Sequence, residues 1–341
     1  MRVTCFSSFT FGYLDRARVL FSSLKRFHPD WDLVALITDE PPPGFTLRIE
    51  EEPFNRVVYA HELGVEDFRS WLFKHDVVEI CTAVKGPFLR QACESADAVI
   101  YLDPDTALFE SLEPILERLE RDDILLTPHL LDPNTDRQAI LDNDLSASRT
   151  GIFNLGFVAI RAAGEGLRFA DWWKARLLEF CYDDIPSGLF VDQKWCDHAP
   201  ALFEKVGVVR DPGCNVASWN LSQRRVEIGR DGAITVNGAP LRFWHFTKLG
   251  PTGDAMTRRY AQGSHAVDEI WRWYKEQVAA CAVPAPPGYW AYGAYSDGVP
   301  IPRAHRLIWR ERADLHARFP DPFDAGGYRR WLEEHEDMEP A

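Results

Sequence analysis

The first forty residues carry the pattern that most constrains the fold. Residues 2–9 and 32–38 are short apolar runs of strand length. Between them, apolar residues recur at helical spacing from Leu14 to Leu24, and Pro29 ends the pattern because proline disfavours helix before it. A strand, a helix and a second strand in this order predict an α/β fold that opens with a parallel strand pair.

Strand and helix patterns continue along the chain. Residues 66–94 are mostly helical in pattern, with a break expected at Gly86-Pro87. Residues 98–102 form a continuous apolar run, which is typical of a strand buried on both faces of a sheet. We predict further strands at 124–127 and 153–160, and a helix rich in Trp and Leu at 169–181.

The composition changes towards the C-terminus. Residues 282–303 hold many Pro, Gly and Tyr residues, and residues 304–334 have an Arg-rich helical pattern. A boundary therefore falls between about residues 260 and 285. We predict a main domain at residues 1–260 and a mostly helical C-terminal extension at residues 261–341.

The composition excludes several classes of protein. The 341 residues are 46% hydrophobic, which is enough for a large core, yet no apolar run is long enough to span a membrane. The N-terminus lacks the pattern of a signal peptide, so we expect a cytoplasmic protein. A net charge of −14 argues against nucleic acid as a partner. The odd number of cysteines, seven, argues against a full disulfide framework, and the lack of any Cys-x-x-Cys pair argues against a zinc site.

Two carboxylates follow the apolar run 98–102 directly. Asp103 and Asp105 flank Pro104, which restrains the turn so that both side chains can converge. In parallel α/β sheets, ligands bind just outside the carboxyl ends of the strands. Hard oxygen ligands suit Mg²⁺ or Mn²⁺, so the pair is a candidate metal site. The alternative is a solvated turn, because Asp-x-Asp triplets often arise by chance.

Four segments, in chain order, resemble one family of enzymes. They are Val99-Ile-Tyr-Leu-Asp-Pro-Asp-Thr106, Phe153-Asn-Leu-Gly-Phe-Val158, Val191-Asp-Gln-Lys-Trp195 and Trp244-His-Phe-Thr-Lys248. Together they resemble the retaining glycosyltransferases that include glycogenin and the bacterial lipopolysaccharide galactosyl- and glucosyltransferases, in a bacterial subgroup. The resemblance covers roughly residues 1–250. It implies that residues 1–260 form a GT-A catalytic domain, a Rossmann-like mixed sheet flanked by helices.

The resemblance assigns a third metal ligand and a phosphate contact. His245 would join Asp103 and Asp105 in binding Mn²⁺ or Mg²⁺, and Lys248 would contact the diphosphate of the donor. Thr247 stands where the family has Gly, and Lys248 is shifted from the position of the family's Lys. The alternative for His245 is a histidine at the edge of the core with one satisfied nitrogen. In an acidic protein, a divalent metal would neutralise a diphosphate.

The resemblance also places residues at the donor sugar. Asp192 and Gln193 would lie beside the reacting carbon, where they stabilise the transition state or bind hydroxyl groups. Asp192 could instead cap a helix. Asn154 and Gly156 would approach the sugar, since glycine inside a strand indicates a close approach and a buried asparagine needs partners. Leu155 replaces the family's Ser.

A lysine and the ends of the first two strands complete the candidate donor site. Lys85 lies among apolar residues, so we expect it to point inward to the donor or to the Asp103 loop; a solvated lysine is the alternative. In the GT-A fold the ends of the first strands cradle the nucleoside, although turn chemistry alone explains the same residue types. The residues at these ends are Ser7, Ser8, Thr38 and Asp39.

The predicted function is metal-dependent transfer of a sugar from a nucleotide-sugar donor to an acceptor hydroxyl. A UDP-sugar is favoured, and the resemblance implies retention and a role in bacterial surface-glycan assembly. The acceptor stays open among a glycan, a lipid-linked molecule and a protein. The basic segment 303–312 is either an amphipathic helix with a solvated Arg face or a dock for an anionic acceptor or membrane surface.

Two rival functions remain at this point. A nucleotidyltransferase that makes nucleotide sugars would need a Gly-rich phosphate loop with a basic residue, but Ser7-Ser-Phe-Thr-Phe-Gly12 has one glycine and no lysine. A non-catalytic sugar-binding protein would not need the candidate metal ligands to be intact. The lack of a Gly-rich phosphate loop and the intact set of candidate metal ligands both favour the glycosyltransferase.

Overall fold

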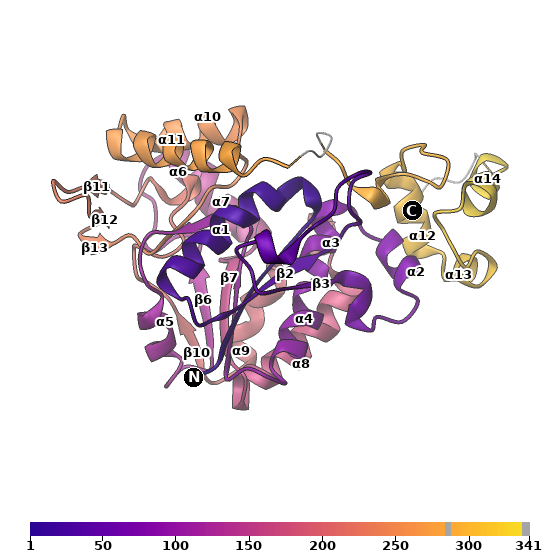
Figure 1. Ribbon diagram of the computed structural model, residues 1–341, viewed down its shortest axis with the longest axis horizontal. Helices are drawn as coiled ribbons and strands as arrows, with labels where there is room; N and C mark the ends of the chain where they lie inside the picture. Colours follow the sequence, from indigo (N-terminus) through magenta and orange to yellow (C-terminus); the bar gives the residue numbers. More distant parts are fainter. Residues whose placement is uncertain (284–287, 336–341) are drawn as a thin grey trace.

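The computed structural model describes residues 1–283 and 288–335 and is built around a seven-stranded sheet (Figure 1). The strand order is β10-β6-β7-β4-β1-β2-β3. Neighbouring strands are parallel except at β7, which is antiparallel to β4 and to β6. The predicted α/β fold with a mixed sheet is confirmed. The strands are β1 (Val3–Phe9), β2 (Asp32–Ile37), β3 (Arg56–Tyr59), β4 (Ala98–Leu102), β6 (Ile124–Pro128), β7 (Phe153–Arg161) and β10 (Val206–Val208).

Helices cover both faces of the sheet. On one face, α1 (Leu14–Phe27) and α5 (Glu113–Arg118) pack over alternate residues of the central strands. On the other, α4 (Lys85–Ala92) and α8 (Gly164–Phe180) pack over the remaining ones. This arrangement buries β1, β2 and β4 on both sides, which explains their continuous apolar sequences.

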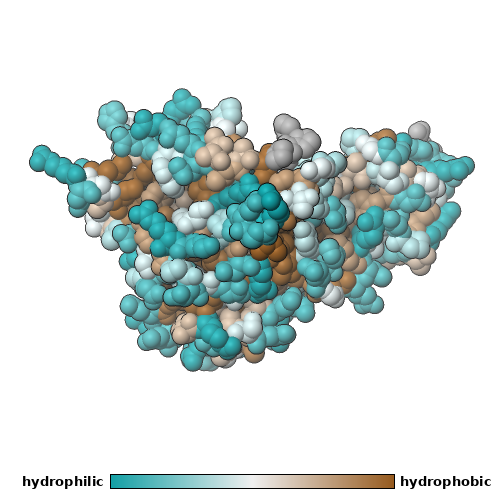
Figure 2. Space-filling model, in the orientation of Figure 1, coloured by the Kyte–Doolittle hydropathy of each residue, from teal (hydrophilic) through white to brown (hydrophobic). Residues whose placement is uncertain are grey.

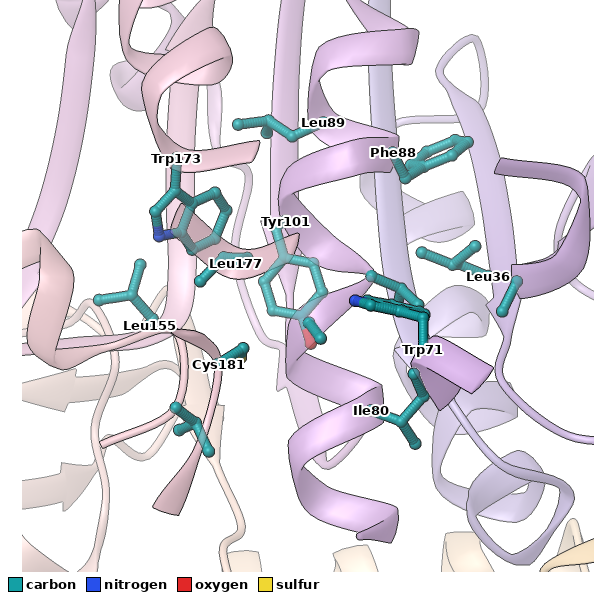
Figure 3. Close-up of a cluster of buried hydrophobic side chains, with 14 of the residues drawn as sticks. Leu36, Trp71, Ile80, Phe88, Leu89, Tyr101, Leu155, Trp173, Leu177 and Cys181 are labelled. Atoms are coloured by element: carbon teal, nitrogen blue, oxygen red, sulfur yellow. The ribbon is translucent and has the colours of Figure 1, made fainter. Parts of the chain in front are cut away.

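The core under α4 and α8 is rich in large side chains. Tyr101 of β4 lies between Trp173 of α8 and Phe88 of α4 (Figure 3). Its ring also meets Phe6 of β1 edge to face, with centroids 5.0 Å apart. Tyr101 therefore runs through the core while its hydroxyl reaches the carboxyl end of β4, where Asp103 follows.

The segment predicted as one helical region is divided into three helices. These are α2 (Phe68–Phe73), α3 (Val77–Ala83) and α4. Asp76 begins α3 by accepting hydrogen bonds from the N–H groups of Val78 and Glu79. The break expected at Gly86-Pro87 lies slightly earlier, at Val84 between α3 and α4. Gly86 and Pro87 themselves lie in the first turn of α4, where proline is compatible with helical geometry.

Short elements complete the main domain. A two-stranded pairing of β5 (Thr106–Leu108) with β14 (Phe243–His245) lies beside the end of β4. The other short strands are β8 (Asp183–Asp184), β9 (Leu189–Phe190), β11 (Val226–Ile228), β12 (Ile234–Val236) and β13 (Ala239–Pro240). The remaining short helices are α6 (Arg137–Ala139), α7 (Leu145–Thr150) and α9 (Ala199–Leu202).

The C-terminal part is mainly helical, as expected. Helices α10 (Pro251–Ala261) and α11 (His265–Ala280) lie near α1, and α12 (Arg303–Glu311), α13 (Ala313–Arg318) and α14 (Arg330–Glu333) lie towards the other end of the molecule (Figure 1). The predicted extension, 261–341, includes 284–287 and 336–341, which lie outside the described residues. Its boundary stays a prediction.

The visible surface is mostly polar (Figure 2), in keeping with the 26% of charged residues in the sequence. No helix among the described residues combines the length and the apolar character needed to cross a membrane.

Candidate active site

Asp103, Asp105 and His245 come together at the carboxyl end of β4. One ligand atom from each lies within 4.8 Å of the others. His245 Nε2 is 3.0 Å from Asp105 Oδ1 and 3.6 Å from Asp103 Oδ2. The pairing of β14 with β5 produces this approach, since His245 stands opposite Thr106, the residue after Asp105. Two carboxylates and an imidazole form a donor set that could hold a metal ion.

Gly156 makes room for the imidazole of His245. A Cβ atom at Gly156 would lie 2.5 Å from His245 Cε1 and 2.6 Å from Nδ1. The carbonyl of Gly156 also accepts a hydrogen bond from the N–H of Asp103, at 2.9 Å. The group that closely approaches Gly156 is therefore the imidazole of His245, a candidate metal ligand.

Within the cluster, His245 and Asp105 shift each other's pKa values towards the charged forms. Burial alone would lower the pKa of His245, but the Asp105 and Asp103 carboxylates outweigh it and raise the pKa. Burial alone would raise the pKa of Asp105, and His245 outweighs it in the opposite direction. His245 Nδ1 is buried and has no hydrogen-bond partner among the described residues.

Lys85 links the candidate metal site to Asp192. Its Nζ atom lies 2.8 Å from Asp192 Oδ2 and 3.2 Å from Asp103 Oδ1. It also donates to the carbonyl of Leu155 at 3.1 Å and lies 4.1 Å from the centre of the Tyr101 ring. Lys85 is buried, and it faces inward to the Asp103 loop as expected.

The pKa values of Lys85 and Asp192 are both shifted in this buried ion pair. Burial alone would lower the pKa of Lys85, but Asp103 and Asp192 outweigh it and raise the pKa well above its ordinary value. For Asp192, burial outweighs the opposing effect of Lys85 and raises the pKa to about 6. The carboxylate of Asp192 is thus engaged with Lys85 and not with the start of a helix, which removes the capping alternative.

Buried amides lie next to this ion pair. Asn154 Oδ1 accepts from the N–H of Gly156 at 3.1 Å and from Asn215 Nδ2 at 2.9 Å. Gln193 Nε2 donates to the carbonyl of Thr150 at 2.9 Å, and Gln193 Oε1 lies 3.4 Å from Asn154 Nδ2. The sequence did not predict a role for Asn215 in the site. Its backbone adopts a left-handed φ of 54°, a conformation that asparagine tolerates better than most residues.

The predicted nucleoside residues lie at the carboxyl ends of β1 and β2. Ser8 Oγ donates to the carbonyl of Cys81 at 2.6 Å and lies 3.2 Å from the hydroxyl of Tyr101. Thr38 Oγ1 lies 3.0 Å from the sulfur of Cys81. The hydroxyl of Ser7 is buried and has no partner among the described residues. The hydroxyl groups of Ser8 and Thr38 therefore contact Cys81 and Tyr101 in the core beneath the site.

Asp39 forms a hydrogen bond with the C-terminal part of the chain. Its carboxylate accepts hydrogen bonds from the N–H groups of Ala291 (2.8 Å), Glu40 (3.0 Å) and Phe11 (3.3 Å). Burial nevertheless outweighs these bonds and raises the pKa of Asp39 to about 6. The sequence offered no sign of the contact with Ala291, because 252 residues separate the two positions.

Lys248 is exposed and adopts a left-handed φ of 57° just beyond β14. It forms no ion pair within the described part of the chain. Burial alone would lower the pKa of Arg16, in the first turn of α1, but Tyr13 and Asp105 outweigh it and raise the pKa. Sequence reasoning did not single out Arg16, since an arginine in a helix is most often solvated.

The arginines of α12 face the main domain. Arg306 is buried and donates to the carbonyls of Phe73 (3.2 Å), His75 (2.9 Å) and Tyr292 (2.6 Å). Arg310 forms an ion pair with Glu79, with 2.8 Å between Nη2 and Oε2. The alternative of a solvated Arg face therefore does not hold for these two residues, because backbone carbonyls and a buried carboxylate bind them. Peripheral membrane contact stays a prediction.

The chain has relatives in Bacillus subtilis (strain 168). It is 29% identical to the uncharacterized protein YfnF over 241 residues, which cover 69% of this chain and 78% of YfnF. It is 25% identical to the uncharacterized protein YfnD over 235 residues, which cover 67% of this chain and 72% of YfnD. No protein-family model matches the sequence.

The similar solved structures include glycosyltransferases. The galactosyltransferase LgtC, in complex with donor and acceptor sugar analogues, has a TM-score of 0.47 at 17% identity, covering 83% of this chain and 97% of LgtC. Mouse xyloside xylosyltransferase 1 has a TM-score of 0.43 at 15% identity, covering 73% of this chain and 98% of that enzyme. The chain resembles glycosyltransferases.

Proposed function

We propose that the protein is a metal-dependent glycosyltransferase that transfers a sugar from a nucleotide-sugar donor to an acceptor hydroxyl. The observation that carries the proposal is the cluster of Asp103, Asp105 and His245, with the buried Lys85–Asp192 ion pair beside it. The predicted donor is a UDP-sugar, and the predicted outcome is retention at the anomeric carbon. Mn²⁺ or Mg²⁺ is the expected cofactor.

The three ligand candidates would hold the metal through two carboxylates and one imidazole. When bound there, a divalent ion supplies Lewis-acid stabilisation to the nucleoside diphosphate leaving group. Tyr101 donates a hydrogen bond of 2.5 Å to Asp103 Oδ1, and Lys85 approaches the same oxygen. These partners fix the direction of the carboxylate before any ligand binds.

The buried polar groups beyond Lys85 suit the donor sugar. Asp192, when ionised, would stabilise positive charge that develops at the anomeric carbon. The amides of Asn154 and Gln193 would bind sugar hydroxyl groups. In a retaining transfer without a separate base, the departing diphosphate takes the proton of the acceptor hydroxyl. Lys85 keeps Asp192 in place throughout.

The nucleoside and diphosphate contacts complete the proposed donor site. Gly156 and Lys248 would contact the donor, together with four residues at the ends of β1 and β2. These four are Ser7, Ser8, Thr38 and Asp39. The resemblance to lipopolysaccharide transferases supports a role in bacterial surface-glycan assembly, with a glycan, lipid-linked or protein acceptor. The cytoplasmic location proposed for the reaction comes from the N-terminal sequence pattern.

Hydrolysis of nucleotide sugars tests this function. We expect the protein with Mn²⁺ to release free sugar from UDP-sugars, and Asp105→Ala to abolish the release. Asp268→Ala is a matched control, because Asp268 is an exposed aspartate on α11. Full activity in Asp105→Ala would contradict the metal assignment. Binding of UDP and Mn²⁺ by a wild-type protein that never releases sugar would instead indicate a non-catalytic sugar-binding role.

A further inference from the structure

A cavity of about 290 Å³ lies at the surface between residues 141–149, residues 218–219 and residues 256–260. These residues belong to η4 (Ile140–Asp144) with α7, to η7 (Ser218–Asn220) and to α10, which contact one another in this order. The lining of the cavity includes none of the residues proposed for the donor site. Its volume is close to the roughly 300 Å³ of the smallest ligand pockets, so it can take one small ring.

Two walls of the cavity contact residues of the candidate active site. Trp219 lines the cavity, and its ring meets the imidazole of His245 edge to face, with centroids 5.2 Å apart. At the end of α7, the carbonyl of Thr150 accepts a hydrogen bond from Gln193 Nε2 at 2.9 Å. A molecule in the cavity would therefore lie one residue away from a candidate metal ligand and beside the helix that holds Gln193.

The acidic group of the cavity already has partners. Asp142 Oδ2 accepts a hydrogen bond from the hydroxyl of Tyr260 at 2.7 Å and forms an ion pair with Arg259 at 2.5 Å. Asp142 Oδ1 accepts from Gln138 Nε2 at 2.9 Å. Both oxygens of the carboxylate are therefore engaged, and Arg259 neutralises its charge.

Arg149 supplies a cation to the same cavity. It belongs to α7 and is exposed, so a ligand can reach it. Within residues 1–283 and 288–335 it forms no ion pair, and its Nε atom makes a long contact of 3.4 Å with the carbonyl of Leu145. Because Asp142 and Arg259 cancel, the charge that the cavity offers to a ligand is the guanidinium of Arg149, which suits a carboxylate or a phosphate.

An aromatic ring and a cation side by side suit one kind of acceptor. A sugar ring carries C–H groups on one face, and these pack against the electron-rich face of an aromatic ring. We propose that this cavity binds the acceptor of the transfer, and that the acceptor is a sugar with an anionic group. Its ring lies on Trp219 and its carboxylate or phosphate on Arg149. The inference rests on the proposed function and narrows the acceptor to a charged sugar.

The acceptor site places a hydroxyl group for the transfer. The oxygen of this hydroxyl bonds to the anomeric carbon of the donor, and the bond from that carbon to the diphosphate breaks. The proton of the hydroxyl passes to the departing diphosphate. Trp219 and Arg149 take no part in these bond changes and act by binding the acceptor beside the donor.

Transfer to matched glycosides tests the acceptor site. The full chain with Mn²⁺ receives UDP-glucose or UDP-galactose, and the acceptors are methyl glucuronide, methyl glucoside 6-phosphate and the neutral methyl glucoside, with the galactose series alongside. We expect kcat/KM to be about 10-fold higher for a charged acceptor than for its neutral counterpart. The carboxylate and phosphate arms show which anion the site takes. Since the net charge of −14 repels anions, such a preference has to come from the site.

Arg149→Ala is expected to remove this preference. The KM for the charged acceptor should rise about 10-fold, the effect of losing a hydrogen bond to a charged group, and the KM for the neutral one should change by less than about twofold. Arg149→Lys should recover part of the loss because it keeps the charge. Arg137→Ala is the matched control, since Arg137 is an exposed arginine of the neighbouring α6 that does not line the cavity.

Two substitutions of Trp219 test the stacked ring. Trp219→Leu is expected to raise the KM for charged and neutral acceptors alike, by about 3- to 10-fold. Trp219→Phe should raise it less, because phenylalanine keeps an aromatic face. Equal losses in the two variants would overturn the stacking of the acceptor on Trp219.

The outcomes separate the acceptor site from the proposed function. A wild type that hydrolyses the donor but transfers sugar to none of these glycosides overturns the acceptor site and leaves the proposed function standing. Neutral acceptors used as well as charged ones, or a wild-type KM for the charged acceptor in Arg149→Ala, have the same meaning. A wild type that neither hydrolyses the donor nor transfers its sugar overturns both.

Discussion

At the scale of single residues, Gly156 decides whether His245 can meet the carboxylates. The imidazole lies where a side chain at position 156 would begin, and the carbonyl of the same residue holds the N–H of Asp103. One position in β7 thus seats two candidate metal ligands from different parts of the chain. Glycine at this position contributes to the geometry of the site although it supplies no ligand atom.

Gly156→Ala is therefore expected to weaken Mn²⁺ binding about 10- to 100-fold, as the loss of support for a metal ligand does. The added methyl group would displace the imidazole or the strand. Titration with Mn²⁺ followed by paramagnetic relaxation measures the change. Gly293→Ala is the control, since its methyl group would meet nothing closer than 3.5 Å. Wild-type Mn²⁺ affinity in Gly156→Ala would show that the ring of His245 is not needed.

The raised pKa of Asp39 predicts that the stability of the folded chain depends on pH. Burial raises its pKa from 3.8 to about 6 in the folded chain, so the folded state holds the proton more tightly than the unfolded state. Its contribution to stability is complete below the unfolded pKa and is lost as the pH rises through about 6.

Urea denaturation of the wild type and of Asp39→Asn, at several pH values, measures this contribution. The free energy of unfolding of the wild type, relative to the variant, is expected to fall as the pH rises from about 3.8 to about 6. A difference that stays constant over this range would contradict the raised pKa.

At the scale of elements, α12 is held to the main domain by its arginines. Arg306 supplies donors to three carbonyl oxygens, two of which, those of Phe73 and His75, lie at the end of α2. Arg310 neutralises Glu79, which also joins the capping of α3. The docking of this helix is thus polar at its centre, with aromatic side chains around it.

Arg306→Met tests this docking. The variant keeps an apolar chain of similar length and leaves three carbonyl groups without their donor. We expect the free energy of unfolding to fall by about 2–4 kcal/mol, the cost of several lost bonds to a buried charge. Chemical denaturation gives the value. Arg318→Met, at an exposed arginine of α13, is expected to change it by less than about 0.5 kcal/mol.

At the scale of the whole molecule, the proposed function requires an acidic chain to bind an anionic donor. With a net charge of −14, nucleotide alone meets repulsion, and metal alone finds three ligand residues and no phosphate. We therefore expect Mn²⁺ and UDP together to raise the melting temperature by about 4 °C at ligand concentrations near 100 times Kd.

Each ligand alone is expected to give a smaller shift in melting temperature. Thermal denaturation with both ligands, each alone and neither provides the comparison, and Asp105→Ala should lose the joint effect. An equal shift with UDP in the absence of metal would contradict a shared site.

The sequence by itself determined the class of the fold and the place of the carboxylates. Apolar periodicity and turn chemistry act over a few residues, so the strand–helix–strand opening and the Asp103–Asp105 turn after a buried strand were readable locally. The resemblance of four segments added His245 and Asp192. The short β5–β14 pairing, by contrast, has too few residues to carry a period.

Only the tertiary structure decided which distant residues meet. His245 reaches Asp105 across 140 positions because β14 pairs with β5. Lys85 of α4 meets Asp192, which follows β9 and whose carbonyl accepts a hydrogen bond from Trp173 of α8, because α4 packs against α8. The buried positions of Arg306 and Gly156 likewise depend on what packs against them. Local sequence sets which element a residue belongs to, but its partner depends on how complete elements fill one core, and that is a property of the whole chain.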